Sequence, residues 1–234
     1  MRLSVFSRDV MTSLLTSVDE FLRTEGLFAR AGAERSRFWA QVRMVAFCGA
    51  VYGMVMGSFH GLSGDGWKQI ALSAAKVPLL FLATFALCFP SFYVLNALAG
   101  LRDDFPRVIN AVLGFQSLTA IVLAALAPIT ELMNLSTASY SFMLFWSGIM
   151  FAVATVCGQW RMNSMYRPLI ASNSRHRLLA IGWIALYWFV GIQMAWVLRP
   201  FVGSPGMPFQ LLRPQAWGNA YVEVAELILR VLRR

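Results

Sequence analysis

Five long apolar segments determine what this chain can fold into. Each is about 20 residues long, which is the length that a helix needs to cross the hydrocarbon core of a bilayer. They occupy residues 39–59, 77–97, 108–130, 140–160 and 178–198 and cover nearly half of the 234 residues. We therefore expect an all-α polytopic membrane protein with five transmembrane helices.

Composition excludes a soluble domain. The chain is 58% hydrophobic and 13% charged, with a mean hydropathy of +0.61, which is typical of membrane proteins. Its net charge of +9 comes largely from arginines beside the apolar segments, where cations favour cytoplasmic flanks and anionic headgroups. We expect a lipid bilayer as partner and no nucleic acid.

Three parts follow from this pattern: an N-terminal cytoplasmic segment (1–38), the transmembrane domain (39–198) and a C-terminal part (199–234). Residues 9–25 carry an apolar helical stripe opposite a face of mixed charge. This favours docking onto the protein's own body or a partner over binding to anionic lipid. Residues 200–216 hold four of the nine prolines, so they cannot form a regular helix. Residues 217–234 are predicted to form an interfacial amphipathic helix.

Arginine placement predicts the orientation. If the five segments alternate across the membrane, the outer loops together contain one cation, Lys68, apart from Lys76 at the edge of the second segment. Twelve arginines fall on the N-terminal side: Arg2, Arg8, Arg23, Arg30, Arg35, Arg37, Arg102, Arg107, Arg161, Arg167, Arg175 and Arg177. Because cations accumulate on cytoplasmic loops, we expect a cytoplasmic N-terminus, an outer C-terminus and, in a bacterium, location in the inner membrane.

The first apolar segment contains a tandem small-residue motif. Gly49, Gly53 and Gly57 are spaced four apart and so share one helix face, where another backbone can approach closely. The motif predicts either helix packing within the chain or a homo-oligomer interface.

Four polar residues in or beside the apolar segments are candidates for a pore lining or a polar network: Lys76, Asn96, Gln116 and Thr119. Interhelical hydrogen bonding is the simpler explanation for the uncharged ones. For Lys76 we expect the ammonium to snorkel to the outer interface, with anion binding or pore lining as the alternative.

Two charged clusters lie between the apolar segments. Arg161, Arg167, Arg175 and Arg177 are predicted to form a loop that contacts a partner or anionic lipid, although positive-inside bias also explains them. Asp104, in an acid pair with Asp103, is followed by Pro106, which suits a helix start with Asp104 as the cap. A cation or partner site at this acid pair is the alternative.

The sequence contains no motif that is typical of an enzyme. None of the 11 acidic residues lies inside the five segments, which argues against a proton-driven pump. The sequence has no HExxH, CxxC, P-loop or GxSxG motif, and His60 and His176 are assigned to opposite sides of the membrane. We expect no enzyme, metal or cofactor.

A family resemblance covers about 40 residues. The stretch PSFYVLNALAGLRDDFPRVINAVLGFQSLTAIVLAALAPI combines a helix ending at a glycine, a short charged loop and a second helix with a distal proline. With five spans and a cytoplasmic N-terminal region, it resembles the Yip1-like membrane proteins. The ending WVLRPFVGSPGMPFQLLRP is similar to uncharacterised bacterial membrane proteins. The Yip1-like resemblance implies a five-helix fold and a membrane-organising role.

The sequence is compatible with two functions. The first is a non-enzymatic scaffold or assembly factor that recruits membrane-protein partners. The alternative is a homo-oligomeric ion or small-solute channel packed through the Gly49, Gly53 and Gly57 face. A transporter is disfavoured because the spans contain no acids and no inverted repeat is evident.

Overall fold

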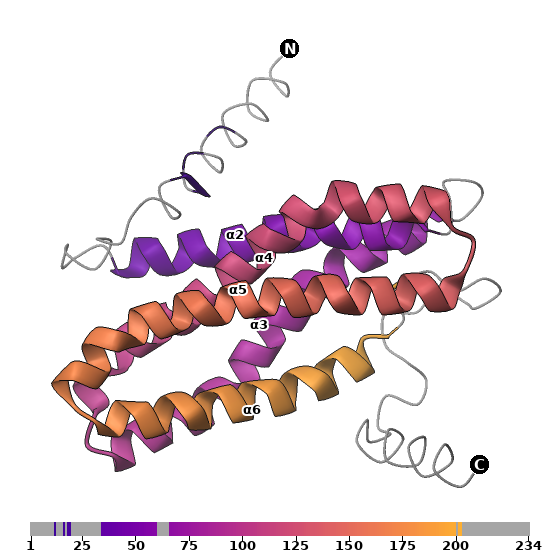
Figure 1. Ribbon diagram of the computed structural model, residues 1–234. Coiled ribbons are helices and arrows are strands. Elements are labelled where there is room, and N and C mark those ends of the chain that lie inside the picture. The colour runs from indigo at the N-terminus through magenta and orange to yellow at the C-terminus, as the bar shows by residue number, and fades with distance from the viewer. Residues whose placement is uncertain are drawn as a thin grey trace, which may run out of the picture.

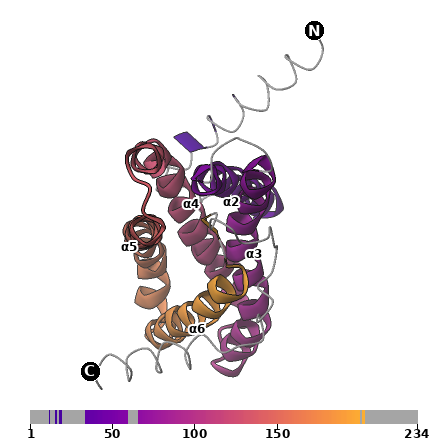
Figure 2. The ribbon, with the colours of Figure 1, turned by 90° about the vertical axis from the view of Figure 1, so that its right-hand side faces the viewer.

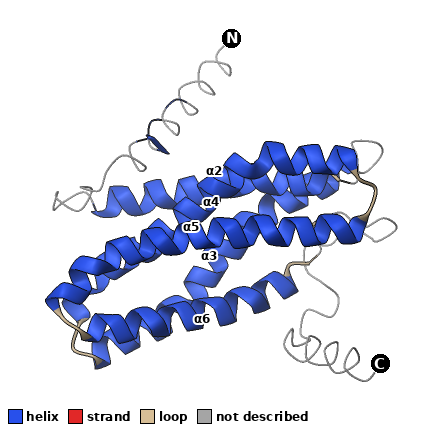
Figure 3. Ribbon diagram, in the orientation of Figure 1, coloured by secondary structure: helices blue, strands red, loops and turns tan. Residues whose placement is uncertain are grey.

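The computed structural model describes residues 34–59, 66–199 and 201–202, together with Thr12, Thr16, Val18 and Asp19. Regular structure in these ranges is helical (Figure 1 and Figure 3). It comprises α2 (Glu34–Ser58), α3 (Gly66–Leu98), the 3-10 turn η1 (Arg102–Asp104), α4 (Phe105–Ser136), α5 (Tyr140–Ser172) and α6 (Arg175–Val197). All five α-helices are long and apolar enough to cross a membrane. The predicted five-helix membrane fold is confirmed.

Three of the helices, α3, α4 and α5, are much longer than their apolar segments. α3 begins at Gly66 rather than at residue 77, α4 continues to Ser136, and α5 continues to Ser172. A helix of 33 residues is about 50 Å long, whereas the hydrocarbon core is about 30 Å thick. The ends of α3 and α5 therefore project beyond the hydrocarbon or the helices tilt.

The helices are arranged in the order α5, α4, α2, α3, α6 around the bundle, which Figure 2 shows nearly end-on. α2 packs along both α3 and α4, and α4 also packs along α5. α6 packs mainly on α3 and makes few contacts with α5, although the two are consecutive in the chain. α5 and α6 therefore diverge from their connecting turn.

The two larger of three hydrophobic clusters divide the core along its length. One, built from α3, α4, α5 and α6, lies toward the end where α5 joins α6, and includes Phe92 against Trp183 with ring centroids 4.4 Å apart. The other is built from α2, α3, α4 and α5 and includes Phe201 and Val202. This second cluster contains no residue of α6. Phe201 and Val202, which follow α6 in the chain, pack there instead.

Local sequence explains two helix ends. Gly100 adopts a left-handed φ of +73° and ends α3, with Leu101 N–H donating to Asn96 C=O at 2.9 Å and Gly100 N–H to Ala97 C=O at 3.1 Å. This paired pattern is a Schellman turn. At the start of α5, the Ser139 hydroxyl accepts a hydrogen bond from the Phe142 N–H, which is the usual role of an N-cap serine.

The predicted amphipathic segments, 9–25 and 217–234, lie outside the described residues except for the four near the N-terminus. Of the predicted apolar stripe, the structure places Val18. It packs against Met44, Cys48 and Ala120, as expected for a segment that docks onto the protein's own body.

Candidate functional site

The three glycines of α2 face α3 of the same chain. A Cβ atom on Gly53 would lie 2.9 Å from the Ala74 Cα and would overlap the neighbouring backbone carbonyl, and one on Gly57 would lie 2.7 Å from the Ile70 Cα. Gly49 lies against Pro78. Of the two predicted roles, close packing within the chain is the one observed. α3 fills this face and leaves no room there for a second copy.

Lys76 is fully buried, with 0% of its surface exposed. It lies about 9 Å along the helix axis from the middle of α3, within the thickness of the hydrocarbon core. The prediction that its ammonium snorkels to the interface is therefore wrong. The side chain is enclosed by protein.

The buried face of α3 that carries Lys76 also carries Gln69 and Ser73, at helical spacings of three and four. Ser73 Oγ donates to the Phe201 carbonyl at 2.5 Å. Gln69 Nε2 donates to Ser73 Oγ at 3.0 Å and lies 3.5 Å from the Phe201 carbonyl. We call these three side chains the polar face of α3. Through Gln69 and Ser73, this face binds the backbone of Phe201, which follows α6.

The other predicted network residues lie apart. Gln116 Nε2 donates to the Phe81 carbonyl and to Tyr187 Oη, both at 2.8 Å, and so joins α4 to α3 and α6. Thr119 Oγ1 and Asn96 Nδ2 donate to carbonyls of their own helices. Lys76 and Asn96 are separated by about 30 Å along α3. The four residues therefore do not form one network.

An acidic residue, Glu131, lies directly after the apolar segment 108–130. Glu131 is in α4 because that helix continues past residue 130. Its Oε2 accepts hydrogen bonds from Ser58 Oγ at 2.6 Å and from Asn134 Nδ2 at 3.0 Å. Asn134 Nδ2 also donates to the Val55 carbonyl at 2.7 Å. Glu131 lies about 16 Å from the middle of α4, so this cluster joins α2 to α4 near the edge of the hydrocarbon core.

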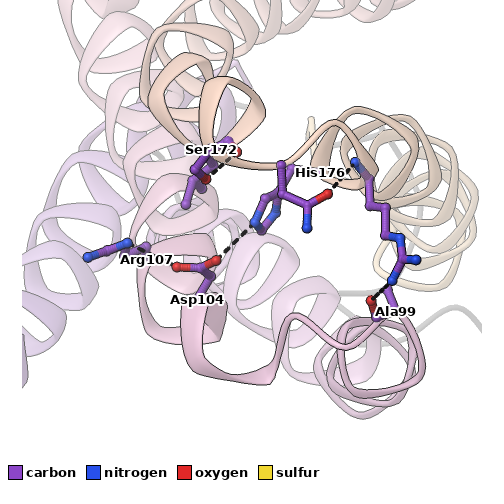
Figure 4. Close-up of polar contacts among 8 residues, drawn as sticks. Ala99, Asp104, Arg107, Ser172 and His176 are labelled. Carbon is purple, nitrogen blue, oxygen red and sulfur yellow. Dashed lines mark hydrogen bonds and ion pairs between the residues drawn. The ribbon is translucent and has the colours of Figure 1, made fainter.

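A second polar cluster joins the connections at the other end of the bundle (Figure 4). His176 is fully buried, and its Nε2 lies 3.1 Å from Asp104 Oδ2, within hydrogen-bond distance. Arg107 forms an ion pair with Asp104 Oδ1 at 2.9 Å. Arg175 donates to the Ala99 carbonyl at 3.1 Å. These contacts bind the α3–α4 connection to the start of α6.

Asp104 therefore has a different role from the predicted cap. It occupies the N-cap position of α4, but its side chain makes no capping hydrogen bond. The carboxylate bonds to Arg107 and His176 instead.

The arginine cluster is mostly helical rather than a loop. Arg161 and Arg167 are on α5, Arg175 and Arg177 begin α6, and only residues 173–174 separate the two helices. Arg161 is half-buried, whereas the other three are exposed. Arg37 lies in the first turn of α2, and Arg102 and Arg107 flank the start of α4, so the antiparallel order places these three at the same end. This end, which we call the Arg-rich end, holds six arginines against Asp103 and Asp104 among residues 37–59 and 66–199: Arg37, Arg102, Arg107, Arg167, Arg175 and Arg177. Arg43 and Arg161 lie further inside, about 5 and 8 Å from the middles of α2 and α5.

Sequence reasoning did not identify the contacts made by His176, Glu131 or Ser73. His176 and Asp104 are 72 residues apart, and Ser73 and Phe201 are 128 apart. Glu131 follows the apolar segment directly, so a search extended by two helical turns would have included it. No comparable signal in the sequence pairs the other residues.

Among the described residues, no group of three or more His, Cys, Asp or Glu side chains could hold a metal ion. The fold and these sites define a five-helix bundle of the multi-pass membrane class. Comparison with protein-family models, curated proteins and solved structures finds no match.

Proposed function

We propose that this protein is a non-enzymatic membrane scaffold or assembly factor that binds an acidic segment of a partner protein at its Arg-rich end. The observation that carries the proposal is the set of contacts from Asp104 to His176 and from Arg175 to the Ala99 carbonyl. These contacts join the end of α3, the start of α4 and the start of α6.

The exposed side chains at this end form a cationic surface. Its members come from η1, α4, α5 and α6: Arg102, Arg107, Arg167, Arg175 and Arg177. A surface whose backbone is already fixed loses less conformational entropy when it binds. Guanidinium groups also form paired hydrogen bonds to carboxylates. The surface therefore suits a carboxylate-rich partner.

The packing inside the bundle supports a structural role. α2 and α3 are in backbone contact at Gly53 and Gly57, and Gln116 joins three helices through hydrogen bonds. Such contacts favour one fixed helix arrangement. The Yip1-like resemblance implies the same membrane-organising role.

Site-specific photo-crosslinking in cells tests the proposal. A photoreactive residue replaces Ser172, which is exposed at the Arg-rich end, and in a matched control it replaces Ser139, which is exposed at the opposite end. We expect a protein adduct from position 172 and not from position 139. The combined change Arg167→Glu and Arg177→Glu should reduce the adduct about tenfold or more, because facing like charges cost several kcal/mol.

Three results would contradict the scaffold proposal: adducts of lipid alone at position 172, equal protein adducts at both positions, or an adduct that survives the double charge reversal. Lipid adducts that disappear on charge reversal would assign the cationic surface to anionic headgroups instead.

A further inference from the structure

Three hydroxyl groups meet inside the half of the bundle opposite the Arg-rich end. Tyr52 of α2, Thr130 of α4 and Ser147 of α5 are 0%, 0% and 3% exposed. Each lies six or seven residues from the end of its helix on that side, which is about 10 Å along the helix axis. The three helices therefore carry these residues at one level, and the Tyr52 hydroxyl lies beside the hydroxyls of Thr130 and Ser147.

The surroundings of these hydroxyls are apolar. Tyr52 belongs to the hydrophobic cluster formed by α2, α3, α4 and α5, which also contains Met143 and Met150. Its ring lies against Phe151 of α5, with ring centroids 5.6 Å apart. Because the three side chains are enclosed in this way, their hydrogen bonds must be formed at the site itself.

The protein satisfies only part of this requirement. Thr130 Oγ1 donates to the Leu126 carbonyl of its own helix at 3.2 Å, so this oxygen is left as an acceptor. Among the residues that the structure describes, neither Tyr52 Oη nor Ser147 Oγ has a hydrogen-bond partner of normal distance and angle. An unpaired hydroxyl in an apolar interior costs free energy. The site therefore requires a small partner that can both donate and accept.

From these observations we propose that Tyr52, Thr130 and Ser147 bind one water molecule between α2, α4 and α5. A buried water molecule typically forms about three hydrogen bonds to polar groups that have no other partner. Here it accepts from the Tyr52 hydroxyl, donates to Thr130 Oγ1 and bonds to Ser147 Oγ. None of the three hydroxyls is charged, which suits a neutral ligand better than an ion.

A polar cluster lies between this site and the near end of the bundle. Asn134 donates to the carbonyl of Val55, one helical turn after Tyr52, and to Glu131, which follows Thr130 in the chain. The bound water exchanges with solvent along this side of α4. The proposal does not depend on the scaffold function, because it concerns the opposite half of the bundle from the Arg-rich end.

Hydroxyl-radical footprinting by X-ray radiolysis tests the site in the full chain, because radicals formed from a bound water molecule modify the side chain that it touches. Tyr187 is the matched control. It is also buried, but its Oη accepts a hydrogen bond from Gln116 Nε2 at 2.8 Å. We expect Tyr52 to be modified at least about tenfold faster than Tyr187, although Tyr52 is the more deeply buried. Equal protection of the two tyrosines would show that the three hydroxyls bond to one another directly, and would overturn the proposal.

The role of the other two hydroxyls is tested by the double change Thr130→Val and Ser147→Ala, which removes two partners of the water with little change in shape. Modification of Tyr52 should then fall to the rate at Tyr187. Ser117→Ala is the control, since it removes a buried hydroxyl about 20 Å from Thr130 along α4, and should leave the rate at Tyr52 unchanged. An unchanged rate in the double variant would show that these hydroxyls do not hold the water. If the double variant does not fold, the comparison of Tyr52 with Tyr187 in the native chain still decides whether the site is hydrated.

Discussion

Individual residues act in this bundle mainly by letting helices approach or by joining them. Lipid tails are as apolar as leucine side chains, so helix association in a membrane relies on close van der Waals packing and interhelical hydrogen bonds. Gly53 allows close packing of α2 against Ser73 and Ala74 of α3. Gln116 of α4 forms interhelical hydrogen bonds to α3 and α6.

The prediction at this scale is that Gly53→Ala destabilises the fold by about 1–3 kcal/mol, because the added methyl group forces α2 and α3 apart. Gly148 is the matched control, since a Cβ there would meet nothing within 4 Å. Gly148→Ala should be neutral or stabilise by up to about 1 kcal/mol through helix propensity. Thermal unfolding in detergent measures both. Equal midpoints for the two variants would show that the α2–α3 contact is looser than the structure indicates.

At the scale of elements, the connections of the Arg-rich end are short and joined to one another. The α3–α4 connection begins at Gly100, whose positive φ suits glycine, and only two residues separate α5 from α6. Because α6 makes few contacts with α5, its position depends on α3 and on the contact between His176 and Asp104.

Asp104→Asn should loosen this junction. The change weakens the hydrogen bond to buried His176 and removes the ion pair with Arg107, each a charge-assisted contact. Hydrogen exchange of residues 99–107 and 173–178 should accelerate about tenfold or more.

The neighbouring variant Asp103→Asn is the control, since Asp103 is exposed. It removes the same charge from the same connection and should leave the exchange rates unchanged. If both variants accelerated exchange equally, the effect would come from net charge rather than from the contact between Asp104 and His176.

At the scale of the whole molecule, charge is distributed asymmetrically along the bundle. Among residues 37–59 and 66–199, six arginines and two aspartates occupy the Arg-rich end, whereas the charges near the opposite end are Lys68, Glu131 and Arg199, and Lys76 is buried on that half of α3. The positive-inside rule concerns short connections like those at the Arg-rich end. We therefore propose that the Arg-rich end faces the cytoplasm.

Single-cysteine labelling measures this orientation. In a background with the three native cysteines replaced by alanine, Ser139→Cys should react with a membrane-impermeant maleimide applied to intact cells. Ser172→Cys should react only after permeabilisation, because the two residues lie at opposite ends of the bundle. The reverse labelling pattern would place the Arg-rich end outside.

Hydropathy by itself determined the number and type of the spanning helices among the residues that the structure describes. A helix satisfies its own backbone hydrogen bonds, so any sufficiently long apolar stretch becomes a spanning helix whatever surrounds it. For this reason the five helices could be predicted, and the glycine spacing also predicted a close-packed face. Helix ends were less predictable: α3 and α5 continue past their apolar segments with polar residues that pack within the bundle or project from it.

Only the tertiary structure decided which residues meet. The partner of the glycine face is α3, Lys76 is enclosed rather than exposed, and His176 contacts Asp104 across 72 residues of chain. The return of Phe201 and Val202 into the core likewise depends on α6 diverging from α5. These contacts depend on the rotation and crossing of helices, which packing sets collectively, whereas hydropathy is a property of each segment alone.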